Sequence, residues 1–161
     1  MKRLATPLMA VVLTVMAPAA MAGTVAQQNG AAAAAADSAE AAIRAVLEGY
    51  AAAVARSDIA GMEAFVDTSD AFSVFEGNHV NRGWADYRDN HLTPEFASPD
   101  FRIRDYTIDD IRVGVGDPLS YATFRYHLRA EVGGEPRERK GLATVVLVKT
   151  PAGWKIRHEQ S

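Results

Sequence analysis

A histidine near the carboxyl-terminal end of the chain has a type and spacing that could support chemistry. His158 alternates with Trp154 and Ile156, and alternate residues of a strand point to the same face. A histidine that faces the interior could act as a general base or acid, because its pKa lies near neutral pH. The alternative is a hydrogen-bonded wall residue that only shapes the interior. The sequence therefore offers His158 as the candidate catalytic residue.

A second candidate group is the pair His91 and Glu95. The two residues are four positions apart, a spacing that presents both side chains on one side of a helix. Imidazole and carboxylate there could form an acid–base pair, or could bind zinc or a similar divalent ion with His158 as a third ligand. Pro94 lies between them and could break their shared face, because proline cannot donate the backbone bond of a continuing helix.

Aromatic side chains are the third group. Tyr50 and Tyr126 could donate hydroxyl hydrogen bonds to a reacting molecule. Trp84, Tyr87 and Phe72 could line a pocket, together with His91 and Glu95, and stack on a flat apolar ligand. The alternative is that these aromatic residues, which recur at helix and strand spacing, only pack in the core.

Three helices are expected to position these groups. Asp37 and Glu40 form a capping box ahead of apolar residues that recur at intervals of three and four, which predicts a helix that ends near Ser57. A short second helix is expected to begin with Asp58 as its cap. Residues 84–92 are expected to form the third helix, which Pro94 would end or restart.

The remaining residues show the alternation of strands. Residues 71–76 and a short returning strand flank Gly77-Asn78, a hairpin turn signal. From Phe101 onward the apolar residues alternate, and their phase slips near Asp109-Asp110, which predicts a bulge there. Gly133-Gly134 predicts another turn. These patterns predict an antiparallel meander that follows the helices.

Residues 142–148 differ from the other strands because they are apolar on both faces. A sheet that packs on one side only should alternate between apolar and polar residues. Helices could cover one face of this strand. We therefore expect a second copy of the protein to cover the other face.

Residues 1–22 have the pattern of a signal peptide. Lys2 and Arg3 precede an apolar stretch, and the small residues of Ala20-Met21-Ala22 predict cleavage after Ala22. The uninterrupted apolar run is about half the ~20 residues that span a membrane. We therefore expect a periplasmic or secreted protein without a membrane anchor after cleavage. Residues 23–36 are expected to be an alanine-rich flexible tail, although alanines could also extend the next helix, and residues 37–161 are expected to be one domain.

Composition excludes several classes of function. The chain has no cysteine and therefore no disulfide, and its formal net charge of −3 with no long basic run argues against nucleic-acid binding. Gly-x-Ser-x-Gly, His-Glu-x-x-His, phosphate-loop and Rossmann motifs are absent from the sequence. Nucleophilic hydrolysis and nucleotide chemistry are therefore not expected, and no cofactor is expected.

The order helix, helix, hairpin, helix and long meander resembles the nuclear-transport-factor-2-like superfamily, and more narrowly its SnoaL-like members. The resemblance rests on residues 43–58, 82–88, 122–126 and above all on the ending Gly-Trp-Lys-Ile-Arg-His-Glu-Gln-Ser at 153–161. It implies an α+β fold in which a curved antiparallel sheet wraps around three helices as a cone with a pocket at its open end. It also implies frequent homodimers through the outer face of the sheet. Members of this superfamily include ketosteroid isomerases, polyketide cyclases and dehydratases.

The expected function is therefore the binding of a small, largely apolar organic molecule in the cone of an exported domain. Catalysis, if present, would be cofactor-free proton transfer of the isomerase, cyclase or dehydratase type. His158 would be the base or acid, with Tyr50, Tyr126, His91 or Glu95 assisting. Two alternatives are a non-catalytic dimeric binding or assembly module, and a metal-binding protein that uses His91, Glu95 and His158.

Overall fold

The computed structural model describes residues 20–161. The predicted signal peptide lies, except for its last three residues, outside the described part of the chain. Helix α1 (Ala20–Ala55) includes the alanine-rich residues 23–36, in line with the high helix propensity of alanine. The chain divides into a unit that ends at Ala34 and a compact unit over residues 35–161. Of the helices in residues 20–161, none has the length and apolar character needed to cross a membrane.

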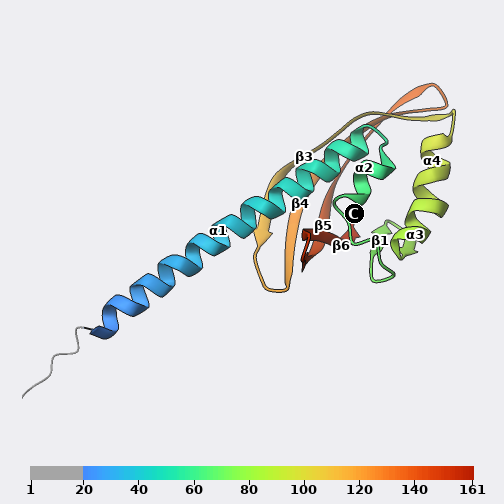
Figure 1. The fold of residues 1–161 in the computed structure, drawn as a ribbon. Coiled ribbons are helices and arrows are strands. Elements are labelled where there is room, and N and C mark those ends of the chain that lie inside the picture. Colours follow the sequence, from blue (N-terminus) through green and yellow to red (C-terminus); the bar gives the residue numbers. More distant parts are fainter. Residues whose placement is uncertain (1–19) are drawn as a thin grey trace, which may run out of the picture. The chain divides into compact units, whose positions relative to one another are not determined.

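One six-stranded sheet forms the framework of the compact unit, in the order β2-β1-β6-β5-β4-β3. Neighbouring strands are antiparallel except β1 and β6, which pair in parallel. Figure 1 shows the long strands curving beside the helices. The α+β class predicted from the sequence is confirmed. The strands are β1 (Ser73–Glu76), β2 (His79–Arg82), β3 (Phe101–Gly114), β4 (Leu119–Val132), β5 (Glu135–Thr150) and β6 (Gly153–Gln160).

The helices form where the apolar spacing predicted them. Ile43, Leu47 and Tyr50 on α1 are buried in the core. Asp58 caps α2 (Ile59–Glu63), and its carboxylate accepts a hydrogen bond of 2.8 Å from the backbone N–H of Gly61. This cap confirms the predicted start of the second helix.

The predicted third helix is longer than expected, because the chain stays helical through Pro94. It consists of α3 (Trp84–Tyr87), a π-helical turn η1 (Arg88–Leu92) and α4 (Thr93–Ala97). Proline lies at the start of α4, a position where a missing N–H costs little. The wider π turn before it accommodates the proline without ending the helix.

The predicted turns and the predicted bulge are present. Gly77 lies in the β1–β2 turn with a positive φ, and Gly133 and Gly134 join β4 to β5 with φ values of 60° and 83°. The register of β3 against β4 shifts between Asp109 and Arg112, as the phase slip predicted. A further shift lies between Ile103 and Asp105.

Strand β6 contains a bulge that its sequence did not predict. Leu147 of β5 pairs with Ile156, whereas the adjacent Val146 pairs with His158. Arg157 is therefore the additional residue on β6, and the residues beyond it are shifted in phase. His158 lies on the same side of the sheet as Val146, and Glu159 takes the inner side.

Candidate functional site

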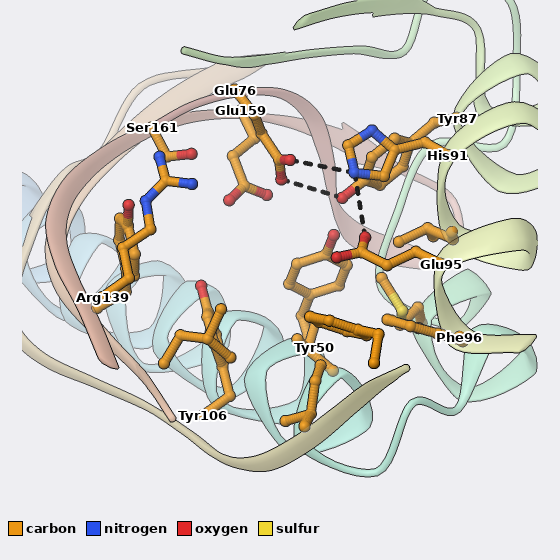
Figure 2. Close-up of a pocket in the computed structure, with 17 residues that line it drawn as sticks. Tyr50, Glu76, Tyr87, His91, Glu95, Phe96, Tyr106, Arg139, Glu159 and Ser161 are labelled. Atoms are coloured by element: carbon orange, nitrogen blue, oxygen red, sulfur yellow. Dashed lines mark hydrogen bonds and ion pairs between the residues drawn. The ribbon is translucent and has the colours of Figure 1, made fainter. Parts of the chain in front are cut away.

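A cavity of about 120 Å³ lies inside the compact unit, between the inner face of the sheet and the helices. This volume is enough for several water molecules or a small organic molecule. Figure 2 shows its polar side chains pointing toward one another across an otherwise apolar and aromatic lining. The polar residues come from several elements: Tyr50, Glu76, Tyr87, His91, Glu95, Tyr106, Tyr126, Arg139, Glu159 and Ser161.

Glu159 is the most unusual group in the cavity. The bulge at Arg157 turns its side chain inward, where it is 5% exposed. Burial raises the pKa of Glu159 to about 8, and the nearby carboxylate of Glu76 adds to the effect. Glu159 is therefore mainly a neutral carboxylic acid at pH 7 and can donate a hydrogen bond.

His91 lies between two carboxylates. Its Nε2 atom is 3.3 Å from Oε2 of Glu76 and 3.3 Å from Oε2 of Glu95. The hydrogen bond with Glu95 and the charges of both carboxylates raise the pKa of His91, against the opposing effect of partial burial. The hydroxyl of Tyr87 donates to Oε1 of Glu76 over 3.3 Å. The result is a charged acid–base cluster at the wall of the cavity.

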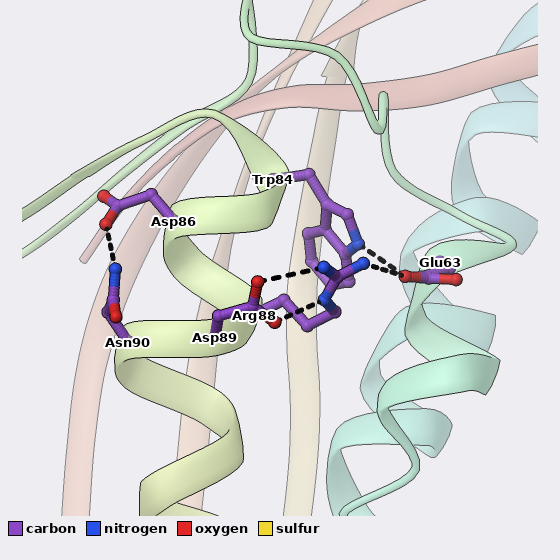
Figure 3. Close-up of polar contacts among 6 residues, drawn as sticks. All are labelled: Glu63, Trp84, Asp86, Arg88, Asp89 and Asn90. Atoms are coloured by element: carbon purple, nitrogen blue, oxygen red, sulfur yellow. Dashed lines mark hydrogen bonds and ion pairs between the residues drawn. The ribbon is translucent and has the colours of Figure 1, made fainter.

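A hydrogen-bond chain behind His91 orients its ring. Nδ2 of Asn81 donates to Asp86 over 3.1 Å, so the amide oxygen of Asn81 faces Nδ1 of His91 at 3.2 Å. Nδ1 therefore carries a proton and donates it. Asp86 also accepts from Asn90 over 2.8 Å (Figure 3) and from the backbone N–H of Arg82 over 3.0 Å, and these bonds keep the pKa of Asp86 low. The Nε2 atom is thereby aimed at Glu76 and Glu95.

The tyrosines supply neutral hydroxyl groups. Burial, followed by nearby acidic groups, raises the pKa of Tyr50, Tyr87 and Tyr106 well above the ordinary value. Their phenols therefore stay protonated and available as donors. The ring of Tyr106 stacks on Tyr126 at a centroid distance of 6.2 Å.

The structure brings five of the predicted site residues to the cavity: Tyr50, Tyr87, His91, Glu95 and Tyr126. His91 and Glu95 are in contact, so their side chains lie on one face of the helix although Pro94 is between them in the sequence. Their catalytic and ligand-binding roles remain predictions.

His158 is not among the residues that line the cavity. Its Nδ1 atom lies 2.8 Å from the hydroxyl of Ser73, and its ring contacts the ring of Phe75 edge to face at 5.0 Å. The predicted inward orientation was wrong because the bulge at Arg157 breaks the alternation. The proposed metal trio of His91, Glu95 and His158 is therefore not assembled. Across residues 20–161, no group of three or more histidine, aspartate or glutamate side chains is arranged to hold a metal ion.

Trp84 and Phe72 are core residues and do not line the cavity. Their side chains are 2% and 1% exposed, and their rings meet edge to face at 5.5 Å. Nε1 of Trp84 donates to Glu63 over 2.8 Å, and Arg88 pairs with the same carboxylate (Figure 3). The prediction that Trp84 and Phe72 bind a ligand was therefore wrong, and both residues pack in the core.

Five polar lining residues were missed by the sequence analysis: Glu76, Tyr106, Arg139, Glu159 and Ser161. The position of Glu76 directly before the Gly77-Asn78 turn was visible, but nothing marked it as inward-facing. Tyr106 follows the first register shift of β3. For Glu159, the only available signal was its place beside His158.

Comparison with known proteins agrees with this architecture. Many solved structures share the fold, and three of them illustrate the likeness. A nuclear transport factor 2-like superfamily protein from Salmonella enterica serovar Typhimurium has a TM-score of 0.69 and 20% identity, covering 77% of this chain and 89% of its own. A candidate ketosteroid isomerase from Shewanella frigidimarina has a TM-score of 0.60 and 20% identity, covering 74% and 93%. The CaMKII hub of S. rosetta has a TM-score of 0.59 and 21% identity, covering 74% and 92%.

The sequence pattern of the SnoaL-like domain family matches residues 43–161. The chain therefore belongs to the SnoaL-like domain family, within the nuclear-transport-factor-2-like fold. A search of curated proteins finds no match.

Proposed function

We propose that this SnoaL-like protein is exported, binds a small, largely apolar organic molecule in its cavity and catalyses cofactor-free proton transfer on it. The observation that carries the proposal is the neutral, buried carboxyl group of Glu159 facing the same cavity as the Glu76–His91–Glu95 cluster. An acid and a base in one cavity, held in different protonation states, are what such a reaction requires. The family membership and the resemblance in fold to a candidate ketosteroid isomerase are consistent with this role.

The proposed reaction begins with a carbonyl oxygen that accepts hydrogen bonds from Glu159 and Tyr50. The Glu76 carboxylate then takes a proton from the carbon next to the carbonyl group. The electron pair of the broken C–H bond forms the enolate, whose oxygen is stabilised by the two donors. Return of the proton from Glu76 to another carbon gives the isomer and restores the carboxylate. His91, whose Nε2 atom lies 3.3 Å from Glu76, holds this base in position.

Exchange of α-protons for deuterium in small cyclic ketones, followed by NMR in D₂O, tests the reaction. The wild-type protein is expected to accelerate exchange above the buffer rate. Glu76→Gln is expected to lower the rate at least about 100-fold, because it removes the base. His158→Ala is the matched control and is expected to keep activity, because His158 does not line the cavity. Binding of the ketones without accelerated exchange would instead identify a non-catalytic binding module.

A homodimer is the second part of the proposal. On the outer face of β4 and β5, the apolar side chains of Leu119, Tyr121 and Leu142 are 50%, 56% and 73% exposed. Large apolar side chains exposed on one face of a sheet are typical of a protein–protein interface. A second copy of the chain would cover these residues, as the two-sided apolar pattern of residues 142–148 predicts.

A further inference from the structure

Arg139 is a lining residue that the proposed reaction does not use. It lies on β5 opposite Leu128 of β4, and both residues line the cavity. Figure 2 places Arg139 beside Ser161 and Tyr106, on the side of the cavity away from His91 and Glu95. A cationic group therefore occupies one end of the cavity, and the acid–base cluster occupies the other.

The guanidinium group of Arg139 has no carboxylate partner within the part of the chain that the structure describes. Several other arginines of the compact unit are paired with acidic residues, as Arg129 is with Asp105 and Arg157 with Asp67. The charge of Arg139 nevertheless acts on the cavity, because it opposes the rise in the pKa of Tyr106. An anion at this end of the cavity would find an uncompensated positive charge.

An aromatic platform holds Arg139 in place. Its guanidinium carbon lies 5.8 Å from the ring centre of Tyr126, within the range of a cation–π contact. Tyr126 lies close against Gly141 of β5, where a Cβ atom would be 2.5 Å from the ring. The glycine therefore allows the ring to lie against the strand. A stacked guanidinium is well suited to planar, bidentate recognition of a carboxylate.

The position of Arg139 favours a negative group on the ligand at that end of the cavity. At pH 7 Glu159 is mainly neutral. Glu76 and Glu95 lie with His91 in the cluster at the other end. One carboxylate on the ligand can be accommodated beside Arg139, whereas a second one would meet the repulsion of Glu76 and Glu95.

We propose that Arg139 binds a carboxylate of the ligand, so that the cavity selects a small monocarboxylic acid with a second carbonyl group at its other end. This inference rests on the proposed function and specifies its substrate class. The carboxylate anchors at Arg139, the apolar body contacts the aromatic walls, and the second carbonyl reaches Glu159 and Tyr50.

Calorimetric binding of 4-acetylbenzoate and of its neutral amide, 4-acetylbenzamide, to the purified protein tests the inference. The acid is expected to bind at least about 10-fold more tightly than the amide, because of the charge-assisted contact. Arg139→Gln is expected to abolish this preference while retaining amide binding. Arg137→Gln is the matched control, since Arg137 is on the same face of β5 but does not line the cavity. Melting temperatures check that both variants are folded.

Three results would overturn the inference. Equal affinity of the wild-type protein for acid and amide would leave the proposed binding cavity intact but remove the role of Arg139. An unchanged preference in Arg139→Gln would place the anion elsewhere. Displacement of the acid by equimolar inorganic phosphate would show that the site is not selective for a carboxylate. Failure of both compounds to bind would count against the proposed function as well.

Discussion

The carboxyl group of Glu159 determines how acid and base can coexist in this cavity. Its pKa is raised to about 8 by burial first and by Glu76 second. The neighbouring imidazole of His91 has the opposite environment, because two carboxylates favour its charged form. The pKa of the carboxyl group and the pKa of the imidazole are thus both raised, by burial in one case and by neighbouring carboxylates in the other. Both shifts arise from position, since neither residue type is unusual.

Replacing Glu159 with glutamine is expected to change how stability depends on pH. The folded-state pKa lies above the unfolded value of 4.5, so the folded state binds more protons between these values. The free energy of unfolding of the wild-type protein should therefore fall as pH rises from about 4.5 to 8. Glu159→Gln cannot ionise and should be more stable than the wild type at pH 9, by on the order of 5 kcal/mol.

Urea unfolding at pH 5, 7 and 9 measures this difference. Glu135→Gln, an exposed position at the start of β5, is the control and should follow the wild type at each pH. Parallel pH curves for the wild type and Glu159→Gln would contradict the assigned protonation state.

The strand bulges explain which parts of the site the sequence could predict. In β3 the apolar residues continue beyond the register shift, so Ile111 and Val113 reveal the change of phase. In β6 only polar residues follow Arg157, and no apolar residue marks the new phase. The hydrophobic pattern therefore predicted the helices, the turns and the first bulge, but it assigned the inward position to His158.

The bulge in β6 is held by an ion pair with the segment after α2. Nε and the terminal nitrogen of Arg157 lie 2.8 Å and 2.7 Å from Asp67, whose side chain is 14% exposed. Arg157→Ala is expected to lower the free energy of unfolding by about 1–3 kcal/mol, because it leaves a largely buried carboxylate without its partner. Arg44→Ala, which removes a more exposed helix pair, should cost less than about 0.5 kcal/mol.

Chemical denaturation of both variants provides the comparison, and the double variant Arg157→Ala/Asp67→Asn completes a thermodynamic cycle. Recovery of part of the lost stability in the double variant is expected. Equal losses for Arg157→Ala and Arg44→Ala would show that the pair does not hold the bulge.

At the scale of the whole molecule, the outer face of the sheet determines the proposed oligomeric state. Leu142→Arg is expected to convert a dimer to a monomer, because it places a charge at the most exposed apolar side chain of that face. Val80→Arg is the control, since Val80 is 52% exposed on the edge strand β2, away from β4 and β5. Light scattering coupled to gel filtration gives the mass of each variant. A monomeric wild-type protein would contradict the proposed dimer.

The parallel pairing of β1 with β6 has a consequence for how the domain folds. The carboxyl groups of Glu76 and Glu159 belong to strands that are distant in sequence and become neighbours only through this pairing. Local hairpins and helices can form early, whereas contacts of such long range close large loops and are slow to form. In a partly folded chain that has only its hairpins in place, the pKa of Glu159 would not yet be raised. The titration of Glu159 would thus report the completion of folding. Partly folded chains would not catalyse the proposed proton transfer.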